Sequence, residues 1–236
     1  MVETAGEGLE EERNNSGREA ETVLGPCLCN YVDQGSTESH RYYLSRRTAL
    51  EMLKDRGYEV AVSEIDLSLE EFRAVHGQNP DVERLRFSVH HRSDPSKRIL
   101  VIFCGTGVVK VNTIRSIASQ IVNKGSLTGL ILIVQNHITS QALKAIDLFS
   151  FKVEIFQITE LLVNITKHVL KPKHRVLTDK EKKNLLKKYS IVEKQLPQLL
   201  KKDAIVRYYG LEKGQVVKVT YDGEITGEHF TYRCVS

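Results

Sequence analysis

The sequence has few of the features that mark secreted, membrane or metal-binding proteins. Its 236 residues include four cysteines. Cys27 and Cys29 form one C-x-C pair with no second pair at zinc spacing, and Cys104 and Cys234 lie in apolar strands. This pattern predicts buried, reduced thiols rather than a disulfide framework or a zinc site. No apolar run approaches the roughly 18 residues of a membrane span, and the N-terminus is acidic, so we expect neither a membrane segment nor a signal peptide.

Patterns typical of catalytic sites are also missing. Gly105-Thr-Gly107 lacks the Gly-Lys-Ser/Thr that completes a nucleotide-binding Walker loop. His90 and His91 are adjacent, so in a strand their side chains face opposite sides and cannot hold one ion. We therefore expect no catalytic residue, no metal site and no cofactor.

Charge is unevenly distributed along the chain, whose formal net charge is +4. Residues 1–21 hold seven Glu and two Arg, whereas residues 167–202 hold twelve Lys or Arg and three acidic residues. Residues 22–166 are nearly neutral. Stand-alone DNA-binding proteins usually carry a basic stripe on their main domain, so DNA near this chain is expected to be held mainly by something else. The basic segment is either a phosphate-binding arm or the solvated face of a helix.

The order of apolar residues predicts an α/β domain over residues 26–166. Residues 1–25 lack aromatic residues and periodicity, which predicts disorder. The sequence predicts helices at 39–56, which Gly57 closes, and at 68–77, which the capping box Ser68–Glu71 opens. Strands are expected at 85–91, 99–103, 130–134 and 152–158, helices at 109–122 and 139–149, and a turn or short helix at 159–166. The uninterrupted apolar runs 99–103 and 130–134 are typical of central strands, and the alternation predicts a mixed sheet with flanking helices.

A smaller α+β domain is predicted for residues 178–236, after a basic linker at 167–177 that contains Pro172. The capping box Thr178–Glu181 predicts a helix. Two antiparallel strands are expected on either side of Asp222-Gly223. Two such strands are marginally stable alone, so they need a helix or a partner protein to cover them.

The most specific pattern lies near the C-terminus. Residues 203–219 read Asp-Ala-Ile-Val-Arg-Tyr-Tyr-Gly-Leu-Glu-Lys-Gly-Gln-Val-Val-Lys-Val, and Thr-Tyr-Arg-Cys-Val follows at 231–235. Four further blocks precede them in order: Asn164-Ile-Thr-Lys-His168, Pro172-Lys-His174, Glu181-Lys-Lys-Asn-Leu-Leu186 and Gln195-Leu-Pro197. This series resembles the C-terminal domain of the fifth subunit of eukaryotic nuclear RNA polymerases, a family that also has archaeal members. Lys54-Asp-Arg-Gly-Tyr58, Phe103 and Gln135-Asn-His-Ile-Thr139 resemble the jaw domain of the eukaryotic members, which the archaeal members lack.

The resemblance implies that the jaw has an endonuclease-like fold without catalytic residues. The metal-dependent nucleases of that fold need a Pro-Asp followed by E-x-K on the next strand. Pro80-Asp81 is present, but the strand expected after it carries no acid, and residues 99–103 carry neither an acid nor a lysine. Glu181–Lys183 is the single E-x-K, and it lies in the other predicted domain.

The family resemblance also implies a nuclear location and two recognition surfaces. Downstream duplex DNA would face two loops of the jaw, at Thr106, Gly107, Asn136, Thr139 and Ser140. The common subunit usually has a proline in each loop, where this chain has Gly107 and Ser140. The alternative is that both loops are merely helix caps.

The second implied surface is the docking site of the C-terminal domain on the largest polymerase subunit. Tyr and Arg are enriched at interface centres because they combine a large contact area with a polar end. The candidate contacts are Arg207, Tyr208, Tyr209, Leu211, Lys218, Tyr232 and Arg233. The alternative is that Tyr208 and Tyr232 close the small domain's own core.

Departures from the usual family pattern resemble the plant paralogue of RNA polymerase V, which makes noncoding transcripts for RNA-directed DNA methylation and gene silencing. Ala204 stands where the family has proline, and Thr220 and Glu228 stand where it has arginine. Interfaces select partners partly by such charge changes, so a different largest subunit is expected. Two alternatives stay open. One is the common subunit of RNA polymerases I, II and III, and the other is a free-standing adaptor that binds transcription factors.

Overall fold

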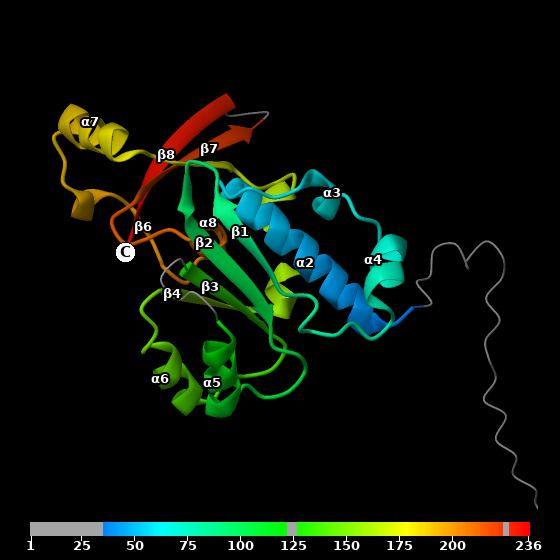
Figure 1. The fold of residues 1–236 in the computed structure, drawn as a ribbon. Helices are drawn as coiled ribbons and strands as arrows, with labels where there is room; N and C mark the ends of the chain where they lie inside the picture. Colours follow the sequence, from blue (N-terminus) through cyan, green and yellow to red (C-terminus); the bar gives the residue numbers. More distant parts are fainter. Residues whose placement is uncertain (1–34, 122–126, 224–226) are drawn as a thin grey trace, which may run out of the picture. The chain divides into compact units, whose positions relative to one another are not determined.

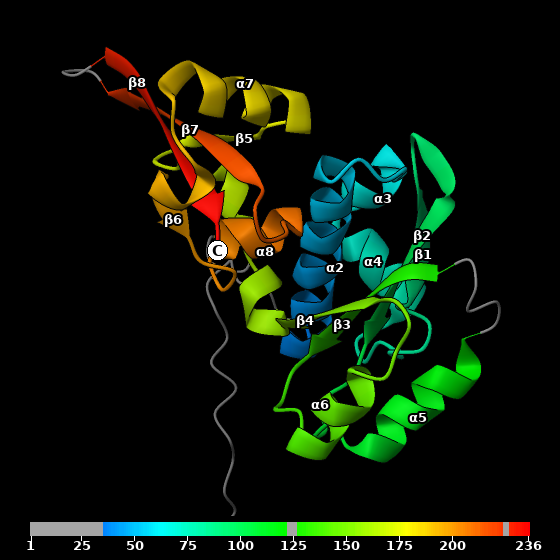
Figure 2. The ribbon, with the colours of Figure 1, turned by 90° about the vertical axis from the view of Figure 1, so that its left-hand side faces the viewer.

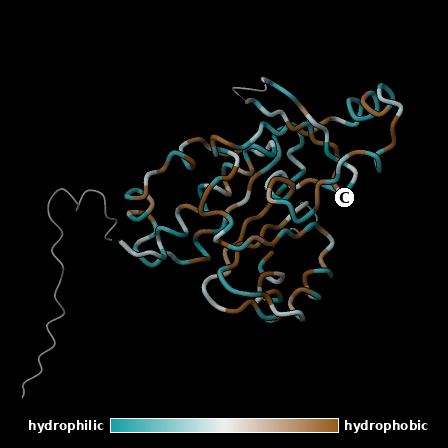
Figure 3. Tube along the Cα trace, turned by 180° about the vertical axis from the view of Figure 1, so that it is seen from behind, coloured by the Kyte–Doolittle hydropathy of each residue, from teal (hydrophilic) through white to brown (hydrophobic). Residues whose placement is uncertain are grey.

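Four strands between residues 87 and 157 form a mixed sheet in the computed structural model, which describes residues 35–121, 127–223 and 227–236 (Figure 1). In spatial order they are β1 (Phe87–His91), β2 (Asp94–Phe103), β3 (Leu127–Val134) and β4 (Lys152–Gln157). β1 runs antiparallel to β2, whereas β2, β3 and β4 are parallel. Hydrophobic residues dominate the traces of the central strands (Figure 3), and β3 is buried at every position except Thr128. The expected mixed sheet and its central strands are confirmed.

Helices cover both faces of this first sheet (Figures 1 and 2). One face carries α2 (Thr37–Asp55), α3 (Val62–Ile65) and α4 (Leu69–His76), and the other carries α5 (Val111–Gln120) and α6 (Ser140–Ile146). Alternate strand residues reach opposite cores because successive side chains of a strand point to opposite faces. Val101 and Ile131 pack with α2, whereas Ile102 and Leu132 pack with α5 and α6.

The capping signals in the sequence act as expected. The side chain of Ser68 accepts a hydrogen bond from the Glu71 N–H, and Glu71 accepts one from the Ser68 N–H, which completes the predicted capping box. Gly57 follows α2 with φ of 93°. There the Tyr58 N–H donates to the Leu53 carbonyl at 2.9 Å and the Gly57 N–H donates to the Lys54 carbonyl at 3.0 Å. This Schellman motif favours glycine, which adopts positive φ without steric cost.

The second sheet has the order β5-β7-β8-β6, and a helix packs on each of its faces. Its strands are β5 (Lys173–Val176), β6 (Gln198–Leu199), β7 (Val216–Gly223) and β8 (Gly227–Val235). Leu185 of α7 (Asp179–Tyr189) packs with Val216 and Cys234, while Val206 of α8 (Ala204–Tyr209) packs with Val217 and Val235. Short 3₁₀ turns lie at η2 (Ile158–Leu161), η3 (Ile165–Lys167) and η4 (Glu193–Gln195). The predicted α+β character is confirmed.

Three expectations need correction. The predicted linker contains β5, which pairs with β7; Lys-His-Arg-Val lacks apolar periodicity, so only the neighbouring strand reveals it. β6 and α8 were not expected, and together with β5 and α7 they supply the cover that β7 and β8 need. β2 begins earlier than expected and includes Asp94 and Lys97, which pair with each other at 3.7 Å near solvent.

Two of the four cysteines, Cys104 and Cys234, belong to the described residues. Cys104 is half-buried, Cys234 is buried, and both are free thiols. Burial raises the pKa of Cys104 to about 11, which keeps the thiol protonated and unreactive near neutral pH. Cys27, Cys29 and the predicted disordered extension lie outside the described residues. Within the described ranges, no helix has the length and apolar character needed to span a bilayer.

Candidate functional site

The two loops expected to face DNA lie side by side. They follow the neighbouring parallel strands β2 and β3, so the sheet brings their carboxyl ends together. Val109 and Ile138 form a parallel bridge between the loops. The Val109 N–H donates to the His137 carbonyl at 3.2 Å, and the Thr139 N–H donates to the Val109 carbonyl at 3.1 Å. The loops therefore form one hydrogen-bonded surface.

An open cavity of about 580 Å³ lies where these loops enter α5 and α6. Its lining consists of Lys110, Val111, Asn112, Thr139, Ser140 and Gln141. The hydroxyl of Thr139 accepts a hydrogen bond from the Ala142 N–H at 3.3 Å and so caps α6. Lys110, at the N-cap of α5, makes no such side-chain bond. The cavity thus combines a lysine with the amino ends of two helices, which favours an anionic group.

Only two of the five predicted DNA-facing residues, Thr139 and Ser140, line this cavity. Thr106 and Gly107 are exposed earlier in the first loop, and Asn136 accepts a hydrogen bond from the N–H of His137 at 2.8 Å. Lys110 and Asn112 were not expected in the site. One sequence feature could have predicted Lys110 in the site: it lies directly before a helix that follows a buried strand.

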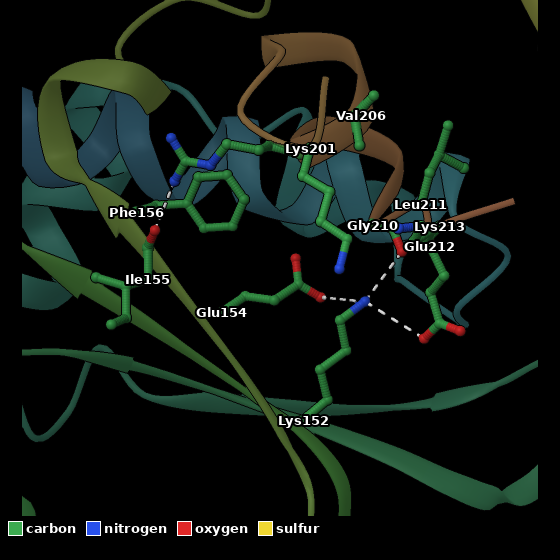
Figure 4. Close-up of a pocket in the computed structure, with 11 residues that line it drawn as sticks. Lys152, Glu154, Ile155, Phe156, Lys201, Val206, Gly210, Leu211, Glu212 and Lys213 are labelled. Atoms are coloured by element: carbon green, nitrogen blue, oxygen red, sulfur yellow. Dashed lines mark hydrogen bonds and ion pairs between the residues drawn. The ribbon is translucent and has the colours of Figure 1, made fainter. Parts of the chain in front are cut away.

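The predicted partner contacts Arg207 and Tyr208 make contacts within the chain, at the junction of the two sheets. The guanidinium of Arg207 pairs with Glu160 at 2.6 Å, lies 4.6 Å from the centroid of the Phe156 ring and donates to the Ile155 carbonyl on the edge of β4. One of these interactions is drawn in Figure 4, where a dashed line marks the hydrogen bond at Ile155. Arg207 therefore fastens α8 to β4.

Tyr208 has only 4% of its surface exposed and belongs to the core on the α2 side of the first sheet. Its hydroxyl donates to the carboxylate of Asp55 at 2.8 Å and accepts from the side-chain amide of Asn164 at 3.2 Å. Burial raises the pKa of Tyr208 well above its ordinary range, and Asp55 adds to this effect. The alternative expectation, that Tyr208 closes the small domain's own core, is therefore wrong.

Arg56, just after α2, joins the same junction and has a side chain that is 6% exposed. Its Nη1 and Nη2 atoms donate to the two carboxylate oxygens of Glu154 at 3.0 and 2.8 Å. Nε donates to the carbonyl of Tyr208 at 2.8 Å, and Nη2 also donates to that of Arg207 at 2.7 Å. These carbonyls belong to the last turn of α8, where few backbone donors remain, and that of Arg207 also accepts from the Gly210 N–H at 3.1 Å. Arg56 therefore caps α8 from the other half of the chain.

A buried carboxylate extends the junction. Glu51 on α2 accepts hydrogen bonds from the Asn164 amide at 2.7 Å and from the Lys167 ammonium at 2.5 Å. Asn164 also accepts from the Thr166 hydroxyl at 2.6 Å. Asn164 and Lys167 lie in the first of the upstream motif blocks, so that block now has a structural role. Residues 35–236 accordingly form one compact unit.

A cavity of about 600 Å³ lies beside the junction, between β4 and the segment that follows α8 (Figure 4). Lys152 points into it and lies between two acids, 3.8 Å from Glu154 and 3.7 Å from Glu212. Its ammonium also donates to the Gly210 carbonyl at 3.1 Å. Three groups of the chain thus hold the Lys152 ammonium. Through its contacts with Gly210 and Glu212, Lys152 links β4 to the segment that follows α8, and it is not a free cation waiting for a ligand.

The remaining predicted partner contacts lie on both faces of the second sheet and near α8. Lys218 and Tyr232 are cross-strand neighbours, and the Lys218 ammonium lies 4.4 Å from the ring centroid of Phe230, which is 49% exposed. Tyr232 packs against the core under α7, which agrees with the alternative that it closes that core. Tyr209 packs against the first core and Leu211 against the core under α8, while Arg233 is half-buried on β8.

Comparisons with known proteins identify the family. A model described as "RNA polymerase Rpb5, N-terminal domain" matches residues 36–121, and one described as "RNA polymerase Rpb5, C-terminal domain" matches residues 163–235. The chain is 64% identical over 219 residues to "DNA-directed RNA polymerase V subunit 5A" of Arabidopsis thaliana, across 93% of this chain and 98% of the relative. The chain belongs to the RNA polymerase Rpb5 family.

Other Rpb5 relatives give graded similarity. "DNA-directed RNA polymerases IV and V subunit 5B" of Arabidopsis thaliana is 60% identical over 220 residues, which cover 93% of this chain and 99% of that relative. "DNA-directed RNA polymerases I, II, and III subunit RPABC1" of Caenorhabditis elegans is 36% identical over 205 residues, which cover 84% and 97%. The C-terminal Rpb5 match begins at residue 163 and so includes Asn164 and Lys167, which reach back to Glu51.

Proposed function

We propose that this chain is a non-catalytic subunit of a plant nuclear DNA-directed RNA polymerase, namely RNA polymerase V, and acts in noncoding transcription for RNA-directed DNA methylation. One observation carries this proposal. The chain is 64% identical to a relative named as a subunit of polymerase V, but 36% identical to a relative named as a subunit of polymerases I, II and III.

The proposed lack of catalysis is supported by what surrounds the candidate acids. Asp81 accepts a hydrogen bond from the N–H of Glu83 at 3.0 Å, so it stabilises a turn. Asp94 and Lys97, at the exposed start of β2, pair with each other.

The two proposed surfaces have different tasks. The paired loops and their cavity near Ser140 guide downstream duplex DNA that the assembled enzyme already holds. An exposed helix amino end favours an anion by only about 0.3–1 kcal/mol, which is too little for capture by a nearly neutral domain. The exposed parts of the second sheet around Lys218, Phe230 and Tyr232 dock on the largest subunit. Phe and Tyr are enriched at interface centres, and the half-exposed Phe230 supplies such an aromatic contact here.

Affinity purification of the tagged full chain from plant nuclei tests the proposal. Mass spectrometry of the purified complex should identify the largest subunit of polymerase V. Recovery with the largest subunits of polymerases I, II and III would instead support the common subunit.

Gel filtration of the same nuclear extract separates the third hypothesis. A polymerase subunit should elute with the large assembly, whereas an adaptor outside polymerase should elute at the size of the 26.8 kDa chain. A dominant pool at monomer size would contradict the proposal even if some chain co-purifies with polymerase V.

A further inference from the structure

Helix α7 lies on one face of the second sheet (Figure 2). It carries the densest group of lysines in the sequence. Its inner side is fixed by Leu185, which is buried against Val216 and Cys234. The capping box Thr178–Glu181 begins the helix. These contacts fix which side of α7 faces outward.

Three lysines share that outward side. At 3.6 residues per turn, Lys180, Lys183 and Lys187 fall within one narrow arc opposite Leu185, and all three are exposed. Asn184 lies beside them and is also exposed. We call Lys180, Lys183 and Lys187 the lysine row.

The lysine row has one acid at neutralising spacing, Asp179, which lies four residues before Lys183 and forms no ion pair with it. Both acids of α7 are in its first turn, and Glu181 is engaged by the capping box and by Arg175 at 2.7 Å. Lys182 shows the contrast, because it pairs with Glu193 at 2.6 Å and donates to the Gly214 carbonyl at 2.8 Å. In the part of the chain that the structure describes, no carboxylate lies within ion-pair distance of the lysine row. Like charges three and four residues apart destabilise a helix, so this arrangement suits an anionic partner.

The chemistry of the row favours phosphates over a protein partner. Protein interfaces are depleted in lysine and need apolar or aromatic anchors, which the outward side of α7 does not carry. Lysine is a point charge well suited to phosphate, and asparagine also donates to phosphate oxygens. At a rise of 1.5 Å per residue the row spans roughly 10 Å, and one strand of a duplex carries about three phosphates over that length of the duplex axis.

We propose that the lysine row binds the phosphate backbone of a nucleic acid, independently of its sequence. This surface lies on the second sheet and is separate from the paired loops of the first sheet. All nucleic acids share a row of phosphodiesters, so labelled probes are needed to show which kind binds. The three probes are a 20-base-pair DNA duplex, an RNA duplex of the same length and a single-stranded RNA.

The test is fluorescence anisotropy of the full-length chain with each probe between 50 and 200 mM salt. The triple variant Lys180→Gln, Lys183→Gln, Lys187→Gln removes three positive charges and keeps helix-forming side chains. For duplex DNA, the plot of the logarithm of the association constant against the logarithm of the salt concentration should become less steep by about two to three. Binding at 50 mM salt should weaken by more than about tenfold. A control variant removes the same charge from exposed lysines elsewhere, as Lys54→Gln, Lys144→Gln, Lys213→Gln.

The control should bind each probe within about threefold of the unmodified chain, and the lysine-row variant should not melt earlier than the unmodified chain, because it relieves repulsion between like charges. Equal losses in the two variants would show general charge attraction and would overturn the proposal. No loss in the lysine-row variant, or no binding of any probe at 50 mM salt, would also overturn it. A peptide of residues 1–34 is the last probe: if it binds through the lysine row while nucleic acids do not, the site belongs to an acidic peptide and the proposal fails.

Discussion

The Nε atom of Arg56 donates a hydrogen bond to the carbonyl oxygen of Tyr208 at 2.8 Å, across 152 residues of sequence. The same guanidinium holds both oxygens of Glu154 on β4. One side chain therefore ties together the end of α2, the edge of the first sheet and the last turn of α8. Because it does so while almost fully buried, the orientation of the C-terminal half depends on it.

Replacing Arg56 should therefore destabilise the whole chain. Arg56→Ala leaves the partly buried Glu154 with only Lys152, at 3.8 Å, and removes the guanidinium donor from the Tyr208 carbonyl, so we expect a loss of about 2–3 kcal/mol in the free energy of unfolding. Arg56→Lys should recover little of this, because an ammonium cannot reproduce the planar fork. Equilibrium urea unfolding measures both changes. A loss below about 0.5 kcal/mol for Arg56→Ala would contradict the capping role.

Gly210 is needed to make room for that guanidinium. It has φ of 62°, and a Cβ atom there would lie 2.9 Å from the Cζ and Nη1 atoms of Arg56. Gly214 also has positive φ, at 89°, but its Cβ would meet nothing closer than 3.7 Å. Each Ala substitution should cost about 1–2 kcal/mol for the backbone, and Gly210→Ala should cost about 1–3 kcal/mol more for the clash. Equal losses in thermal unfolding would show that Arg56 moves aside freely.

Tyr208 offers a separate test of the junction. Tyr208→Phe keeps the buried ring but removes the hydroxyl that joins Asp55 and Asn164, so it should cost about 1–2 kcal/mol. Because Arg207 binds the Ile155 carbonyl on β4 and Tyr208 binds Asp55 on α2, their joint replacement by Ala should lower stability as well as incorporation into polymerase. A double variant with unchanged unfolding free energy that fails to assemble would restore these residues as direct partner contacts.

The sequence predicts well the structure that local signals specify. Ser68, Thr178 and Gly57 mark helix ends through bonds to residues three to five positions away. The apolar runs before Cys104 and Gln135 identify the central strands, because a strand buried on both faces is apolar at every position. This pattern can be recognised without knowing which strands lie beside it. These features follow from propensity and capping, which act within a few residues.

What the sequence leaves undetermined depends on distant neighbours. β5 is a strand because β7 lies beside it, and its own residues lack periodicity. The residue types of Arg207 and Tyr208 predict partner contacts, yet Glu160 and Asp55, which bind them, are 47 and 153 residues away. Arg56 lies inside a family motif, but its four long-range hydrogen bonds have no local signature.

The pH dependence of stability should include a contribution from Glu181. Hydrogen bonds from Thr178, followed by the pairing with Arg175, lower the pKa of Glu181 from 4.5 to about 2. A carboxylate with a lowered folded-state pKa stabilises the fold above its unfolded pKa, and this contribution disappears as the pH falls toward the folded value. At pH 6 the Glu181→Gln variant should therefore have a lower melting temperature than the unmodified chain. The difference between the two melting temperatures should shrink as the pH falls from 4.5 to about 2.

Glu71 provides the matched control for this experiment. It forms the same capping box with Ser68, and only Ser68 lowers its pKa. Glu71→Gln should show a smaller gap in melting temperature than Glu181→Gln, because no arginine contributes. A gap for Glu181→Gln that stays constant down to pH 2 would refute a role for the ionised carboxylate.

The last prediction concerns the cavity beside the paired loops. Ser140 is exposed at the first position of α6 and lines the cavity with Lys110. Ser140→Glu adds a negative charge where the proposed function has a phosphate approach. The same charge at the amino end of α6 suits the helix dipole, so the fold should lose no stability. If the variant holds DNA more weakly but keeps its melting temperature, the loss can be assigned to DNA recognition and not to folding.

The measurement uses the assembled polymerase on a template with downstream duplex DNA. Because an exposed helix end contributes about 0.3–1 kcal/mol, the Ser140→Glu enzyme should release the duplex roughly two- to fivefold faster at moderate salt. The difference should diminish at high salt, since exposed charges are screened. Ser88→Glu, which places the same charge on exposed β1 at the far edge of the first sheet, should leave release unchanged. Equal release by the Ser140→Glu, Ser88→Glu and unmodified enzymes would mean that the paired loops do not face the phosphates.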